Sequence, residues 1–148
     1  MTSSTPTAPP LTHTAAALRL AVGRLSRRMR QESTLGHSLT QIGILVTLDR
    51  EGPTSLGDLA QAERVAPPTI TKAVANLVAE GLVEKVPHPA DGRVHRAQLT
   101  PAGTKDLEAI RRQREAWLTR RLATLEPSEV EQLTAVLPLL EDLSNDED

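Results

Sequence analysis

Apolar residues at the start of the chain recur at alternating steps of four and three. Such spacing places side chains along one stripe of a long helix, and here the stripe consists of Leu11, Ala15, Leu18, Val22, Leu25 and Met29. The pattern is typical of a helix that covers its own core and also of one that packs against a second chain, and it favours neither. Five arginines lie mostly off the stripe and are expected to face solvent, with a place near phosphates as the alternative for some of them: Arg19, Arg24, Arg27, Arg28 and Arg30.

A second group of apolar positions predicts a shorter helix. Thr40 is in position to cap its start, and Gly52-Pro53 is a strong stop signal. Between them lie the apolar residues Ile42, Leu45, Val46 and Leu48. The pattern therefore predicts a helix over residues 40–51.

Two further short helices follow, joined by a tight turn. Ser55, with Asp58 three residues later, resembles a capping box that opens the first of them. After a turn through Arg64, Pro67-Pro68 begins the second helix, and Gly81 is a good stop for it. Two short helices connected in this way predict a helix-turn-helix motif.

The helix over residues 67–80 has two unlike faces. At about 100° per residue, the inner side carries Ile70, Val74, Leu77 and Val78, and the outer side carries Pro68, Thr69, Lys72, Ala75, Asn76 and Ala79. Small residues let a backbone approach a DNA groove closely, and Thr, Asn and Lys side chains bind base edges and phosphates. An ordinary surface helix with few charges fits the same pattern.

Residues 87–103 predict a strand-turn-strand followed by a helix start. Asp91-Gly92 marks the turn, Val94 to Leu99 is extended, and Thr100-Pro101 begins a helix. With the preceding elements, the order becomes helix, turn, helix, strand, turn, strand. The expected fold class is mainly α with a small β-wing, a winged helix-turn-helix with long N- and C-terminal helices.

The C-terminal part predicts two more striped helices. The first runs from Pro101 to about Leu125, the second starts at Glu126-Pro127, and Pro138 is expected to kink it. Together with the first helix they present more apolar surface than one small winged-helix domain can cover. Intertwined helices from two chains would cover it.

Composition narrows the function. The 148 residues indicate one domain, and their net charge of −2 gives no global argument for nucleic acid. The chain has no cysteine, so sulfur chemistry and thiolate metal sites are excluded, and one Trp with no Phe or Tyr counts against aromatic readers of single strands or RNA. No phosphate-binding loop, nucleophile-base set or histidine spacing for a metal stands out, so we expect neither enzyme, nor cofactor, nor metal site.

The first dozen residues have neither the basic start nor the apolar core of a signal peptide, and no later stretch is apolar enough to span a bilayer. We expect a cytoplasmic protein without a membrane partner.

Several segments together resemble the MarR family of bacterial transcription regulators. They are T-x-T-K from Thr69 to Lys72, EGLVEK, Asp91-x-Arg93, and the LT-x-x-G closure from Leu99 to Gly103. With the flanking helices, the resemblance covers nearly the whole chain apart from its two ends.

The resemblance implies a two-fold homodimer that binds a near-palindromic operator in double-stranded DNA. Helix 67–80 would lie in the major groove, and Arg93 would reach the minor groove with Asp91 helping to orient it. It also implies a regulator that is most often a repressor and that releases DNA when a small, often aromatic anion enters the cleft between DNA-binding and dimer helices; the sequence identifies no ligand. The residues expected at the DNA are Ser55, Arg64, Pro68, Thr69, Thr71, Lys72, Asn76, Asp91 and Arg93.

The corresponding organisation has five parts. We expect a disordered tail over 1–10, a dimerisation helix over 11–36, the DNA-binding core over 37–100, C-terminal dimerisation helices over 101–144 and an acidic tail over 145–148.

Two alternatives stay open: the wing is a plain turn with a solvated Arg93, or the whole fold is a protein-interaction module that never binds DNA. One departure from the family is the pair Pro67-Pro68, which removes backbone donors at the start of the recognition helix, where relatives often have a polar side chain.

Overall fold

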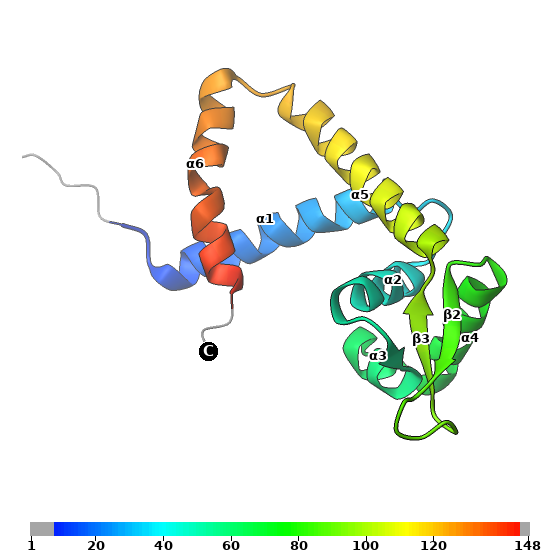
Figure 1. Cartoon of the computed structure of the whole chain (residues 1–148). Coiled ribbons are helices and arrows are strands. Elements are labelled where there is room, and N and C mark those ends of the chain that lie inside the picture. The colour runs from blue at the N-terminus through cyan, green and yellow to red at the C-terminus, as the bar shows by residue number, and fades with distance from the viewer. Residues whose placement is uncertain (1–7, 146–148) are drawn as a thin grey trace, which may run out of the picture.

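The structure, a computed structural model, describes residues 8–145. The expected tails over 1–10 and 145–148 lie mostly outside the described residues. The helices and strands of residues 8–145 are α1 (Leu11–Gln31), α2 (Leu39–Glu51), β1 (Thr54–Ser55), α3 (Leu56–Glu63), α4 (Pro67–Ala79), β2 (Val83–Pro87), β3 (His95–Leu99), α5 (Pro101–Leu122) and α6 (Pro127–Ser144). Figure 1 shows α2, α3, α4 and the sheet gathered into one unit, from which α1 and α5 extend, and α6 leads from the far end of α5 back to the start of α1. We call α1, α5 and α6 the arms.

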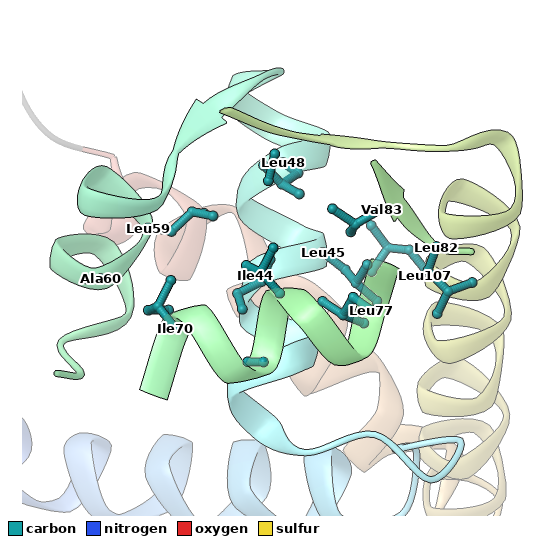
Figure 2. Packing of buried hydrophobic residues seen from close by; sticks show 13 residues of the cluster. Ile44, Leu45, Leu48, Leu59, Ala60, Ile70, Leu77, Leu82, Val83 and Leu107 are labelled. Carbon is teal, nitrogen blue, oxygen red and sulfur yellow. The ribbon is translucent and has the colours of Figure 1, made fainter. Parts of the chain in front are cut away.

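The core lies between α2, α3, α4, the sheet and the first turns of α5. Figure 2 shows its side chains pointing toward one another from these elements. The largest fully buried members are Ile44, Leu45, Leu59, Ile70, Val74, Leu77, Val83 and Leu107. Burial of a side chain of this size contributes about 1.5–3 kcal/mol, so this core holds the helix-turn-helix, the sheet and the start of α5 together.

The inner face of α4 was predicted well except at one position. Ile70, Val74 and Leu77 are fully buried, and Ala73 is also buried. The prediction for Val78 was wrong, because its side chain is 37% exposed at the end of the helix. Glu80 is the C-cap of the helix, and Gly81 follows with φ of 75°, as the stop signal indicated.

The wing contains a strand that the sequence did not indicate. The three-stranded antiparallel sheet has the order β1-β3-β2, in which Thr54 pairs with Ala97 and Val83 pairs with Leu99. β1 is two residues long, and its extended form is fixed by its partner β3. β3 starts at His95, so Val94 belongs to the turn.

The cap of α2 also differs from the prediction. Ser38, not Thr40, caps the helix: its hydroxyl accepts a hydrogen bond from the Gln41 N–H at 3.1 Å, and the Gln41 side chain accepts one from the Ser38 N–H at 2.9 Å. Ser55 caps α3 through the Asp58 N–H at 3.2 Å, but within residues 8–145 the reciprocal bond from Asp58 that a capping box needs is not formed. Thr100 caps α5 through the Gly103 N–H at 3.1 Å, as expected.

The arms carry apolar surface that the rest of the described chain leaves uncovered. Neither α1 nor α6 has a buried residue. α1 ends at Gln31, earlier than the predicted limit of 36; α5 ends at Leu122 rather than Leu125; and α6 continues through Pro138. The large exposed apolar side chains of α1 and α6 are Leu11, Leu18, Leu20, Val22, Leu25, Leu133, Val136, Leu137, Leu139 and Leu143.

Candidate nucleic-acid interface

The outer face of α4 is exposed and lies beside the start of α2. Pro68, Thr69, Lys72 and Asn76 line a groove of about 590 Å³. Its other wall consists of Ser38, Thr40 and Gln41 from α2. The structure therefore brings together four of the predicted contact residues. The α2 residues were not identified from the sequence as part of this surface, because only the fold places them beside α4.

The start of α4 has no free backbone donor in its first three residues. Ala66 is the N-cap without a side-chain hydrogen bond, and Pro67 and Pro68 have no N–H. The Thr69 N–H donates to the Ala66 carbonyl at 2.9 Å. Phosphate binding by backbone N–H groups at this helix end is thus weakened, as the sequence indicated, and side chains must supply the contacts.

Two other predicted contact residues, Thr71 and Arg64, do not line this groove. The Thr71 hydroxyl donates to the Pro67 carbonyl at 3.1 Å, so its donor is used within its own helix. Arg64 is the C-cap of α3 and has φ of 53°, a left-handed conformation that is uncommon for a residue with a side chain. This conformation turns the chain sharply from α3 into α4.

The wing tip is a compact turn with Arg93 exposed on the surface. The Asp91 carboxylate accepts a hydrogen bond from the Arg93 N–H at 3.0 Å, and the Val94 N–H donates to the Asp91 carbonyl at 3.1 Å. His88 closes the base of the turn, because its N–H donates to the Val94 carbonyl at 2.8 Å. The tip thus holds its shape through the Asp91 side chain and its own backbone.

Beneath the wing lies a cavity of about 720 Å³ between β3, α3 and the end of α2. Ser55 and Asp91 line it, as do Arg50 and Arg96. Ser55 therefore lies at the root of the wing and not in the groove beside α4, and its hydroxyl is engaged as a helix cap. The Arg96 Nε is buried and has no hydrogen-bond partner among residues 8–145.

We also searched the described part of the chain for metal sites and membrane-spanning helices. Residues 8–145 contain no group of three His, Cys, Asp or Glu side chains placed to hold a metal ion. The His88 Nδ1 accepts a hydrogen bond from the Ala90 N–H at 3.0 Å, so it is used within the wing. No helix in the same range is long and apolar enough to cross a membrane.

Comparison with known proteins identifies relatives over most of the chain. The MarR family model matches residues 38–95. The HTH-type transcriptional regulator MT0903.1 of Mycobacterium tuberculosis is 42% identical over 127 residues, which cover 85% of this chain and 89% of that protein.

Solved structures agree with this match. A putative transcriptional regulator from Pseudomonas aeruginosa is similar with a TM-score of 0.78 and 31% identity, covering 93% of this chain and 96% of that one. A mutant of MepR from S. aureus, bound to an oligodeoxyribonucleotide, has a TM-score of 0.65 at 22% identity, covering 88% and 98% of the two chains. The second likeness concerns the fold alone.

Proposed function

The chain belongs to the MarR family, and from that premise we propose that it is a homodimeric repressor that binds a near-palindromic operator in double-stranded DNA. The observation that carries this proposal is the outer face of α4. Thr69, Lys72 and Asn76 are exposed there beside the small Ala75 and Ala79, so the helix backbone can approach a major groove while three polar side chains reach base edges and phosphates.

The wing supplies the second contact of each half-site. A narrow minor groove concentrates negative potential, and an arginine on a preformed turn loses little entropy when it enters. Arg93 has these properties, because it is exposed on a turn closed by its own hydrogen bonds.

The uncovered arms support the homodimer. A stable monomer rarely leaves so many large apolar side chains exposed on adjoining helices. Leu18 and Val22 of α1 share an apolar hollow with Leu140 and Leu143 of α6, so the exposed surfaces of these helices are continuous. A second copy that packs its own arms on this surface would bury it, and two-fold symmetry would place two recognition helices about 34 Å apart on one side of the duplex.

A relative supports repression as the mode of regulation. It is the HTH-type transcriptional repressor IacR of Pseudomonas putida, which is 27% identical over 97 residues. A dimer of this chain that occupies a promoter would act in the same sense.

An anionic effector fits a cluster of arginines where α1 meets α5. Burial lowers the pKa of the Arg114 guanidinium, and the neighbouring charges of Arg30 and Arg111 lower it further. Arg111 is also paired with the Asp49 carboxylate at 3.0 Å, so an anion that enters here would offset chiefly the charges of Arg30 and Arg114. We expect small aromatic carboxylates such as benzoate to weaken DNA binding, and Arg114→Gln to weaken this response.

The deciding experiment is a mobility-shift assay on the DNA upstream of the protein's own gene at two salt concentrations. A specific complex that weakens with salt supports the operator-binding function. A folded dimer that binds this fragment no better than random duplex, and selects no sequence from a random library, would point to the protein-interaction module instead.

A further inference from the structure

The connection between α1 and α2, residues 32–38, is drawn into the protein by an unusual turn. Leu35 and Gly36 have successive positive φ angles of 49° and 82°. For a residue with a side chain this conformation is strained, and it persists only where surrounding contacts fix it. The turn directs the next residue, His37, inward.

His37 joins three separate parts of the fold. Its side chain is only 6% exposed, and its Nε2 lies 2.7 Å from the Oδ2 of Asp106 on α5. Its Nδ1 lies 3.5 Å from the Oε2 of Glu80, the C-cap residue of α4. One imidazole thus bridges the α1–α2 connection, the end of the recognition helix and an arm of the molecule.

The two contacts of His37 differ in length. The Nε2 is within hydrogen-bonding distance of the Asp106 carboxylate, at 2.7 Å, whereas the Nδ1 lies 3.5 Å from the Glu80 carboxylate, a longer electrostatic contact. The imidazole is thus held most closely to α5 and faces the end of α4 with its other nitrogen.

A second contact fixes the other end of the connection. Ser33 is fully buried, and its hydroxyl donates to the Met29 carbonyl at 2.8 Å and accepts from the Arg114 Nε at 3.0 Å. The connection is therefore tied to α5 at two points, one near α1 and one near α2. Of these two, the His37 contact also reaches α4.

We propose that His37 is a positioning residue that sets the placement of the recognition helix relative to the arms, and so determines the half-site spacing that the dimer accepts. This inference rests on the proposed operator binding. In a two-fold dimer the separation of the recognition helices follows from how each α4 is held against its own arms. One added base pair moves a half-site by about 3.4 Å along the duplex and about 34° around it. A rigid link between α4 and α5 makes that displacement costly, whereas a loosened link lets α4 follow the half-site.

The test removes the two carboxylates that face His37. The variants are Glu80→Ala, Asp106→Ala and the two combined, and the matched control is Glu84→Ala, which removes an exposed carboxylate on β2 that bonds Gln98 of the wing. The probe is the duplex that the wild-type protein selects from a random-sequence library, made with its native spacing and with one base pair inserted or removed. The measured quantity is the ratio of affinities between native and altered spacing, with dimer content checked by analytical ultracentrifugation.

For the wild type and Glu84→Ala we expect altered spacing to weaken binding by about tenfold to a hundredfold. In the double variant the reduction should fall to about threefold, and the effects of the single variants should be non-additive because both act through His37. A residue that merely supports the fold would lower affinity at every spacing and leave the ratio unchanged. Glu80→Ala keeps the test valid if Asp106→Ala is unstable, since the Glu80 side chain is half exposed.

Two results would overturn the inference, and they differ. If the dimeric variants discriminate spacing as strongly as the wild type, His37 does not set the spacing, and operator binding stands. If the wild-type protein selects no duplex at all, the proposed function fails and this inference with it.

Discussion

The carboxylate of Asp91 accepts a hydrogen bond from the backbone N–H of Arg93 at 3.0 Å. No ion pair between the two side chains occurs within residues 8–145. An Asp side chain that bonds the backbone two residues later forms an Asx turn. Asp91 therefore acts on the backbone that carries Arg93, and the guanidinium stays available for another partner.

We expect Arg93→Ala to weaken operator binding by about 1–3 kcal/mol while the protein stays a folded dimer. Because the guanidinium carries a charge to the DNA, its removal should also lower the slope of log affinity against log salt, by about one for each phosphate that is no longer neutralised in a half-site. Titrations of wild type and variant at several salt concentrations measure both effects. Lys72→Ala is the comparison in the major groove; if it fails to bind while Arg93→Ala binds like wild type, the wing is only a structural turn.

Asp91→Asn and Asp91→Ala should differ from each other. Asn keeps a side-chain oxygen that can accept from the Arg93 N–H, whereas Ala removes the acceptor and loosens the tip. In DNA-binding titrations we expect Asn to bind nearly as well as wild type and Ala to bind more weakly, though the effect should be smaller than that of Arg93→Ala. Equal reductions for the two substitutions would show that the negative charge, and not the turn, is what matters.

Leu137→Asp should convert the dimer to a monomer. The side chain of Leu137 is 51% exposed on α6, so the new charge does not enter the core of one chain, but it opposes burial against a second copy. Analytical ultracentrifugation at micromolar concentration should show a dimer for wild type and for the control Gln61→Asp on the exposed face of α3. A monomeric wild type would refute the dimer outright.

Gly103→Ala should destabilise the fold, whereas Gly57→Ala should not. A Cβ at Gly103 would collide with the backbone carbonyl of Leu82, whereas a Cβ at Gly57 meets nothing within 4 Å. We expect a decrease of about 1–3 kcal/mol in the free energy of unfolding for the first and an increase of about 0.5–1 kcal/mol for the second. Urea denaturation of both variants measures the difference, and similar values would mean that α5 shifts freely away from Leu82.

Local sequence signals predicted the elements that depend on local chemistry. The faces of α4 followed from its periodicity, and the caps at Ser55 and Thr100 followed from residue type and spacing. The error at Thr40 arose because two nearby candidates, Ser38 and Thr40, both suit a cap. The reciprocal bond from Gln41 decides for Ser38.

Contacts between residues far apart in the sequence could not be predicted from it. His37 and Asp106 are separated by 69 positions, and Ser33 and Arg114 by 81, so no periodicity connects them. β1 has two residues, too few for an alternating pattern. Of the candidate site, the groove beside α4 could be predicted on its α4 side, whereas the placement of Ser55 under the wing needed the strand pairing with β3.

The two prolines at the start of α4 also affect the unfolded chain. Proline fixes φ near the helical value, so it lowers the conformational entropy of the unfolded protein, and a helix turn built from two prolines has little freedom left to lose. Pro67 and Pro68 immediately precede Thr69. The first turn of the recognition helix is therefore already rigid before DNA arrives, and the entropy of ordering it is lost during folding and not during association.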